Sequence, residues 1–385
     1  MSLQWRIPLS DLDFGAEEAA AVQRVIAGKW LSMGPEVGAF EREFAAMQGA
    51  RHALAVANAS AALHLAYLAL EIGPGDEIIQ PALNFVAAAN MTTAVGATPV
   101  FADVVDLLEP TIDPRHVERL ITPRTKAVVA MHHGGNLCRM AELAALCRER
   151  GVALIEDACH AIGARYHDDR ARPPHGVMAG SIGDIGTFSF FSNKNLATGE
   201  GGMVVTDRDD LAERVRLLRS HGMSSLTWDR HKGHASSYDV VASGYNYRLD
   251  ELHAALGRVQ LTKLFGNNER RRRLLQAYRD ALQPLQQWTM PFADAVEHSA
   301  GHLAVVIAPS AATRTKAIEA LREARIQSSL HYPCIVDFVL FRNVTTAALD
   351  VTREFVRRAI TVPLFPTMSQ DQVMETVACL RAATA

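Results

Sequence analysis

A single lysine, Lys194, stands in a polar stretch between two apolar segments and is the residue whose setting most suggests chemistry. Residues Thr187–Phe191 and Met203–Thr206 are rich in aromatic and β-branched side chains, which favours two strands joined by a loop. A lysine held against apolar neighbours is shifted toward its neutral amine, the form that attacks a carbonyl carbon and forms a Schiff base. The alternative that stays open is an ordinary hairpin with a solvated lysine.

A pair of acids, Glu156 and Asp157, ends the strongly hydrophobic strand predicted at Val152–Ile155, and His160 follows shortly after. In an open α/β sheet, ligands bind at the carboxyl ends of the strands, which makes this acid pair a functional candidate. Capping of a following helix by Asp157 would explain the same residue. Both interpretations fit the residues alone.

A third candidate is Asn58–Ser60, which follows a predicted strand at His52–Ala57 and opens a helix. Backbone N–H groups at the start of a helix bind anions such as phosphate. An ordinary helix cap by Asn58 has the same sequence signature, so that this pattern also has two interpretations.

These candidates must be positioned by an alternation of strands and helices, which fills the first half of the chain and indicates an α/β fold. Beyond the lysine loop, a long polar segment at 221–243 precedes an amphipathic helix at Leu249–Leu264. The helical pattern continues to Leu282, and its run Arg270–Arg273 is expected on a solvated face. At this length we expect a large domain, residues 1–262, and a smaller C-terminal domain, residues 263–385.

The composition excludes several kinds of function. The net charge of −3 over 385 residues gives no general attraction to nucleic acids or anionic membranes. No signal-peptide pattern or membrane-length apolar run is present, so that we expect a cytoplasmic protein. The five cysteines lack paired spacing, and His132, His133, Cys159 and His160 lack zinc-site spacing, so that neither a disulfide framework nor a metal site is expected.

Motifs spread along the chain together resemble the DegT/DnrJ/EryC1/StrS sugar aminotransferases, a family of fold-type-I enzymes that use pyridoxal 5'-phosphate (PLP). The resemblance implies a large domain with a mostly parallel mixed sheet flanked by helices, plus a small C-terminal α/β domain. Each motif alone is weak, but the set is specific. The motifs are GKWLSMGP, ANASAALHLA, IEDACHAIGA, FSFFSNKNLATGEGGM, SGYNYRLDELHAALG, HYP and ITVPLFPTMSQDQV.

The resemblance implies a role for each matching position. Lys194 matches the lysine that bonds covalently to the cofactor, and Asp157 matches the acid that pairs with its ring nitrogen, which makes these two the expected catalytic residues. A protonated ring nitrogen lets the ring accept the electrons released when the substrate Cα–H bond breaks, and the freed lysine can carry the proton. The other implied cofactor contacts are Ala59, Ser60 and Ser189 at the phosphate, Phe85 on the ring face, His160 near the ring hydroxyl, and Asn246 from a neighbouring subunit.

A homodimer with shared active sites follows from the assignment of Asn246. Some relatives carry this asparagine two positions later, where this chain has Arg248, so that either residue could cross to the partner. The residues that the resemblance places near the substrate are Trp30, Met33, His132, Arg230 and His331.

The implied activity is transfer of an amino group from L-glutamate to a nucleotide-linked ketosugar, for which we expect a 4-keto-6-deoxyhexose. The cofactor would alternate between PLP and its amino form, pyridoxamine phosphate (PMP). The alternatives are an aminocyclitol-forming transaminase and a PLP- or sugar-binding regulator without catalysis. Related PLP-dependent sugar dehydratases carry histidine at the lysine position, so that Lys194 disfavours that activity.

Overall fold

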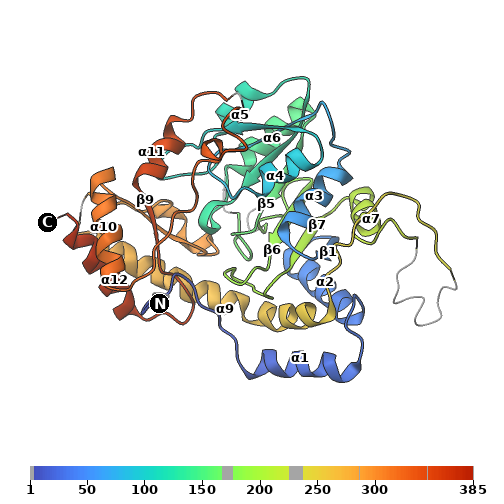
Figure 1. Ribbon diagram of the computed structural model, residues 1–385, viewed down its shortest axis with the longest axis horizontal. Helices are drawn as coiled ribbons and strands as arrows, with labels where there is room; N and C mark the ends of the chain where they lie inside the picture. The colour runs from blue at the N-terminus through green and yellow to red at the C-terminus, as the bar shows by residue number, and fades with distance from the viewer. Residues whose placement is uncertain (1–3, 167–176, 225–236, 286, 345, 385) are drawn as a thin grey trace.

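The computed structural model describes residues 4–166, 177–224, 237–285, 287–344 and 346–384. Within them the chain forms a seven-stranded sheet and a separate two-stranded sheet. The long helix α9 (Glu251–Leu282) extends along one side of the molecule from the large sheet to the small one (Figure 1). The two termini lie at the end that carries the small sheet (Figure 1).

The large sheet has the strand order β1-β7-β6-β5-β4-β2-β3. Neighbours from β6 to β3 pair in parallel, whereas β7 pairs antiparallel with both β1 and β6. The predicted α/β fold with a mostly parallel mixed sheet is therefore confirmed. The strands are β1 (His52–Val56), β2 (Glu77–Pro81), β3 (Thr98–Ala102), β4 (Thr125–Met131), β5 (Ala153–Asp157), β6 (Ile185–Ser189) and β7 (Gly202–Thr206).

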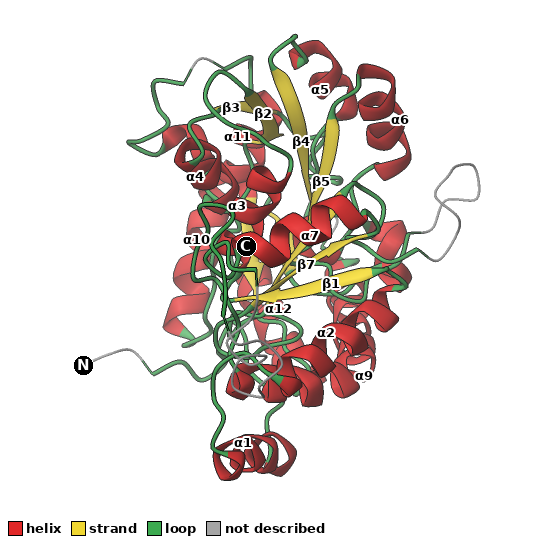
Figure 2. Cartoon of the chain, turned by 90° about the vertical axis from the view of Figure 1, so that its right-hand side faces the viewer, coloured by secondary structure: helices red, strands yellow, loops and turns green. Residues whose placement is uncertain are grey.

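Helices cover both faces of this sheet, which explains why its strands read as nearly continuous apolar runs (Figure 2). Successive side chains alternate between the faces, so that Ala127 and Val129 join one core while Val128 and Ala130 join another. The first core is covered by α3 (Ala59–Ala69), α4 (Ala87–Ala94) and α7 (Asp209–Leu218). On the opposite face lie α2 (Pro35–Gln48), α5 (Pro114–Leu120), α6 (Met140–Arg150) and the first half of α9.

The small sheet pairs β8 (Ala304–Ile307) with β9 (Ala359–Val362) in antiparallel fashion. Its core includes Tyr278 and Leu282 from the second half of α9, whereas Leu264 of the same helix belongs to the core of the large sheet. The predicted boundary between residues 262 and 263 thus lies inside one continuous helix. The other α-helices of the described residues are α1 (Ala16–Gly28), α10 (Ala311–Glu323), α11 (Asp350–Arg358) and α12 (Gln370–Ala382).

One expectation about α9 is wrong. The run Arg270–Arg273 is not uniformly solvated, because Arg271 is only 3% exposed and its Nη1 donates to the carbonyl of Leu364 at 2.9 Å. Burial lowers the pKa of this guanidinium to about 10. Among the described residues, no helix combines the length and apolarity that crossing a lipid bilayer requires.

Candidate active site

A cavity of about 480 Å³ lies where several parallel strands end. Met131, Asp157 and Ser189, the last residues of β4, β5 and β6, all line it. Residues from the start of α3, from the loop before α4 and from the segment between α10 and α11 also line it. Of the residues predicted from the sequence, the structure brings to this cavity Ala59, Ser60, Phe85, Asp157, His160, Ser189, Lys194 and His331.

The first turn of α3 forms one end of the cavity. The Oδ1 atom of Asn58 accepts a hydrogen bond from the N–H of Ala61 at 2.9 Å, which caps the helix at this residue. Gly202 lies directly against this turn, since a Cβ atom there would come within 2.7 Å of the Asn58 carbonyl carbon. Because Gly202 pairs with Ser189 in the sheet, the Ser189 hydroxyl is held near the helix start. Helix N–H groups and a hydroxyl therefore converge on a site suited to an anion.

Lys194 lies in the turn after β6, half-buried in the cavity wall. Its backbone N–H donates to the carbonyl of Phe191 at 2.8 Å, which fixes the turn. Burial lowers the pKa of the Lys194 ammonium, while Cys159 and Asp157 nearby oppose the change. The neutral amine, which is the nucleophilic form, is therefore favoured relative to a solvated lysine.

Asp157 reaches the same cavity from the end of β5. One carboxylate oxygen, Oδ1, accepts a hydrogen bond from the N–H of Cys159 at 3.2 Å. The Asp157 carbonyl accepts from the N–H of His132 at 3.1 Å, which ties β5 to the residue after β4. Asp157 thus occupies the place at the strand ends where the sequence pattern predicted a functional acid.

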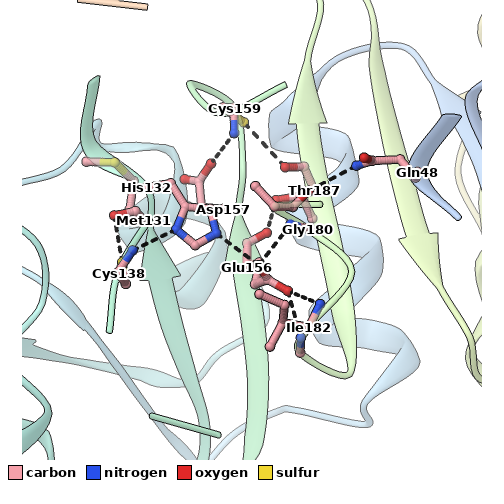
Figure 3. A network of polar contacts seen from close by, with 12 residues as sticks. Gln48, Met131, His132, Cys138, Glu156, Asp157, Cys159, Gly180, Ile182 and Thr187 are labelled. Carbon is pink, nitrogen blue, oxygen red and sulfur yellow. Dashed lines mark hydrogen bonds and ion pairs between the residues drawn. The ribbon is translucent and has the colours of Figure 1, made fainter. Parts of the chain in front are cut away.

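Behind Asp157, the preceding carboxylate is completely buried (Figure 3). Glu156 accepts hydrogen bonds from His132 Nε2 at 2.9 Å and from the backbone N–H groups of Gly180, Ile182 and Gly183 at 2.8, 2.6 and 2.6 Å. Burial alone would raise the pKa of Glu156, but these hydrogen bonds and the proximity of His132 lower it below its ordinary value. The carboxylate therefore holds residues 180–183 against β5.

The prediction that His132 contacts the substrate is wrong. Its side chain is 0% exposed, and its Nδ1 atom accepts a hydrogen bond from the N–H of Cys138 at 3.2 Å (Figure 3). Its Nε2–H group therefore donates to Glu156. Met131 lines the cavity, and the next side chain points away from it, as alternation along an extended chain requires. His132 is part of the buried network behind Asp157.

Histidines form another part of the surroundings of Lys194. The rings of His160 and His302 lie 4.4 Å apart between centroids, and His160 Nε2 lies 2.7 Å from the hydroxyl oxygen of Tyr332. The Nδ1 atom of His331 lies 3.0 Å from the hydroxyl oxygen of Thr361. These contacts join the end of the large sheet to the small one.

The histidines around Lys194 favour the neutral form. Burial lowers the pKa of His331 to about 3 and that of His133 to about 4. Burial, followed by the charge of Lys194, places the pKa of both His160 and His302 well below the ordinary value. The lysine is thus surrounded by imidazoles that add no positive charge.

Other predicted residues do not reach this cavity within one chain. Trp30 donates through Nε1 to the carbonyl of Met33 at 3.4 Å in the loop before α2, and neither residue lines the cavity. Asn246 is exposed, and its backbone pairs with Ser220. Arg230 lies outside the described residues.

Several cavity or near-cavity residues were not predicted from the sequence, and three of them carry polar groups that matter below. Asn84 precedes Phe85, and Tyr332 lies within the HYP motif, so that the motifs themselves could have drawn attention to both. His302 follows a glycine outside any of the motifs, and no local signal marks it.

The residues of the cavity fit PLP. The start of α3 and Ser189 offer donors for a phosphate, Asp157 offers a carboxylate for a cationic ring nitrogen, and Lys194 offers an amine for an aldehyde. The ring of Phe85 is 55% exposed and therefore free to cover an aromatic ligand. Among the described residues, no cluster of three His, Cys, Asp or Glu side chains is arranged to bind a metal ion.

Known proteins are similar to this chain in sequence and in fold. Residues 13–381 match the model of the DegT/DnrJ/EryC1/StrS aminotransferase family. The spore coat polysaccharide biosynthesis protein SpsC of Bacillus subtilis (strain 168) is 39% identical, over 98% of this chain and 96% of its own length.

Two solved structures extend the comparison. The putative sugar aminotransferase Spr1654 of Streptococcus pneumoniae in its PLP form has a TM-score of 0.89 at 25% identity, and the match covers 98% of each chain. DesI, solved in the presence of its TDP-sugar product, has a TM-score of 0.86 at 31% identity, over 100% of this chain and 94% of its own.

Proposed function

Because this chain belongs to the DegT/DnrJ/EryC1/StrS aminotransferase family and is a PLP-dependent sugar aminotransferase, we propose that it transfers the amino group of L-glutamate to a nucleotide-linked ketosugar. We take the acceptor to be a 4-keto-6-deoxyhexose. The observation that carries the proposal is the convergence of Lys194, Asp157 and the anion site at α3 on one cavity.

Each end of the cofactor would be held by a different element. The N–H groups of Ala59 and Ser60, with the Ser60 and Ser189 hydroxyls, would bind the phosphate. Asp157 would pair with the ring nitrogen and keep it protonated, and Phe85 would cover the ring face. His160 lines the same cavity, and we place it beside the ring hydroxyl.

Lys194 would perform the proton transfers. When bound, PLP supplies an electron sink that makes the Cα–H bond of an amino acid acidic. Because its pKa is lowered, Lys194 is favoured as the neutral amine, which can accept this proton and later give it back to complete the transfer. The second half-reaction runs the same steps in reverse on the ketosugar, so that one lysine serves both substrates.

A nucleotide-linked acceptor is supported by the relative DesI, whose structure was solved with its TDP-sugar product. Among the described residues that line the cavity, Lys194 is the only lysine or arginine. We therefore assign the diphosphate to residues supplied from elsewhere, namely Arg230 and the loop of Trp30 and Met33, with His331 at the sugar.

We further propose a cytoplasmic homodimer whose active sites are shared. Asn246 is exposed in the single chain and lies apart from the cavity, as expected of a residue that serves a neighbouring subunit. Arg248 is the alternative, because its Nη1 atom is buried and has no hydrogen-bond partner among the described residues.

The proposal is tested by separating the two half-reactions. The holoenzyme is first converted to its PMP form with L-glutamate and desalted. It is then mixed with dTDP-, UDP- and GDP-linked 4-ketohexoses and with an inosose, and return of the yellow PLP absorption is recorded. We expect a nucleotide-linked 4-ketohexose to restore the absorption fastest. Restoration by the inosose alone would identify an aminocyclitol transaminase, and failure of glutamate and other amino acids to remove the absorption would indicate a regulator.

A further inference from the structure

Asn84 has an unusual environment for a buried amide. The residue is 1% exposed and lines the cavity, yet neither its Oδ1 nor its Nδ2 atom has a hydrogen-bond partner among the described residues. Of the buried carboxamide side chains in the described part of the chain, Asn84 alone has both polar atoms unpaired. Buried polar groups are nearly always paired, because a lost hydrogen bond to water is otherwise not replaced. A bound molecule that enters the cavity is therefore expected to supply the missing partners.

The backbone around Asn84 is fixed in place. Leu83 forms an antiparallel bridge with Cys334, and the N–H of Ile335 donates to the carbonyl of Ala82 at 3.0 Å. These contacts bring the loop after β2 together with the segment that contains Tyr332. The rings of Phe85 and Tyr332 lie 5.7 Å apart between centroids.

Tyr332 presents a hydrogen-bond donor to the same cavity. The Nδ1 atom of His160 accepts a hydrogen bond from the N–H of Gly134 at 3.4 Å, so that the neutral ring carries its proton on Nε2. That Nε2–H group donates to the Tyr332 oxygen at 2.7 Å. The phenol's own proton is then free to point at a ligand. Burial raises the pKa of Tyr332 well above its ordinary value, so that the hydroxyl stays protonated.

The chemistry of these groups selects among the ligands of the enzyme. The phosphate, ring nitrogen and aldehyde of PLP have counterparts elsewhere in the cavity. A carboxylate of the amino-group donor could accept from the Asn84 amide nitrogen, but it would leave the amide oxygen unpaired, because an ionised carboxylate has no proton to donate. A hydroxyl group both donates and accepts, and so can satisfy the amide oxygen or nitrogen of Asn84 and accept from Tyr332.

We propose that Asn84 and Tyr332 form the subsite that recognises hydroxyl groups of the acceptor sugar, an assignment that rests on the proposed function. Asn84 binds a ring hydroxyl directly, and Tyr332 donates to an oxygen beside it. The two side chains thus contribute to specificity in the acceptor half-reaction and take no part in the donor half-reaction.

Separate half-reactions test this assignment in Asn84→Leu and Tyr332→Phe holoenzymes. Asn84→Leu removes both polar atoms at similar volume, and Tyr332→Phe removes one hydroxyl. Gln80→Leu is the matched control, because Gln80 is a fully buried carboxamide on β2 that does not line the cavity. Loss of the PLP absorption with L-glutamate measures the donor half, and its return with a dTDP-linked 4-keto-6-deoxyhexose measures the acceptor half.

We expect Asn84→Leu to slow the acceptor half about 10- to 100-fold at limiting sugar while the donor half changes less than about threefold. Tyr332→Phe should show a smaller loss of the same kind, and Gln80→Leu should change neither half. The acceptor half-reaction is also measured with the 2-deoxy and the 3-deoxy analogues of the sugar. Wild-type enzyme should react more slowly with the analogue that lacks the hydroxyl bound by Asn84, whereas Asn84→Leu should react equally fast with that analogue and with the full sugar.

The contrary outcomes are distinct. If Asn84→Leu slows both half-reactions equally, the amide serves the cofactor or the fold. If the acceptor half-reaction is unchanged, the amide is paired with an ordered water. Either result overturns the subsite. If wild-type PMP enzyme reacts with an inosose and with no nucleotide-linked sugar, the proposed function fails. The variants are then compared with the inosose, itself a polyhydroxylated ketone, and an unslowed Asn84→Leu would overturn the subsite as well.

Discussion

Two polar regions meet at the end of β5, and they differ in how completely their polar atoms are paired. Behind Asp157, Glu156 and His132 are both 0% exposed, and both oxygens of the carboxylate and both nitrogens of the imidazole have protein partners. In front of it, the cavity contains Asn84, whose two polar atoms have no partner in the described part of the chain, and Asn193, whose Oδ1 has none there either. Full pairing is characteristic of structural support, whereas unpaired buried atoms beside a cavity indicate a surface that a ligand completes.

The two regions also differ in whether they stabilise the charged or the neutral form of their titratable groups. The rear region stabilises an ionised carboxylate through donors aimed at it, so that the pKa of Glu156 is lowered. The front region favours neutral histidines by burial, and Lys194 is shifted toward the amine. The rear region can therefore be expected to govern stability, and the front region to govern chemistry.

The largest effect is expected from Glu156→Gln. The amide would turn an NH2 group toward the backbone donors of residues 180–183 or toward the Nε2–H of His132. Each buried donor that loses its acceptor costs about 1–3 kcal/mol of unfolding free energy, and more where the bond was made to a charged group. Urea denaturation of the variant measures this loss. Turnover at low temperature, where the fold persists, should fall less than about tenfold.

Two variants serve as controls for this prediction. Glu149→Gln changes an exposed acid and should cost less than about 0.5 kcal/mol. Asn84→Leu should cost no stability, because it removes atoms that have no partner to lose. A Glu156→Gln protein as stable as wild type, or an Asn84→Leu protein as unstable as Glu156→Gln, would contradict the distinction between the two regions.

A smaller effect, on turnover rather than on stability, is expected from Asp157→Asn. The variant should bind PLP but lose at least about a hundredfold in kcat, because a neutral partner no longer keeps the ring nitrogen protonated. Steady-state assays and PLP absorption measure the two quantities. No helix directly follows Asp157 among the described residues, so that the helix-cap interpretation of this residue does not hold. If Asp157 serves only to accept from the Cys159 N–H in the turn after β5, the variant should be fully active, since asparagine can accept the same hydrogen bond.

The smallest effect concerns acid stability. The folded-state pKa of His331, about 3, is below its ordinary value of 6.5, so that between these values the unfolded chain binds a proton that the folded chain does not. The free energy of unfolding therefore falls as the pH is lowered through this window. His331→Asn should make the loss between pH 7 and pH 5 smaller by roughly 2 kcal/mol.

Urea denaturation at the two pH values measures this difference. His221→Asn replaces an exposed histidine and should leave the pH dependence as in wild type. An unchanged pH dependence in His331→Asn would mean that this imidazole is not kept neutral by the fold.

The comparison also explains what the sequence could reveal. Lys194 and Asp157 were predictable because local patterns mark the ends of strands, where an α/β sheet binds its ligands. His132 was misassigned because a histidine after a strand looks the same whether it faces the cavity or the core, and only the pairing of β4 with β5 decides this.

Other features depend on contacts between distant segments. Asn84 and Tyr332 lie 248 residues apart in numbering and reach the same cavity through contacts between their segments, such as the bridge between Leu83 and Cys334. The burial of Arg271 depends on the segment at Leu364, which packs on α9. Such pairings leave no local signature, since hydrophobic periodicity reports the face of a helix and not what covers it.

The most direct test of the account is the identity of the lysine that holds the cofactor. The holoenzyme is reduced with borohydride and digested, and the peptide that carries the reduced cofactor is sequenced by mass spectrometry. We predict a single labelled site at Lys194, and Lys194→Ala protein without label or turnover, because this is the lysine whose amine faces the cavity with a lowered pKa. A label on another lysine, or an active Lys194→Ala enzyme, would contradict the account.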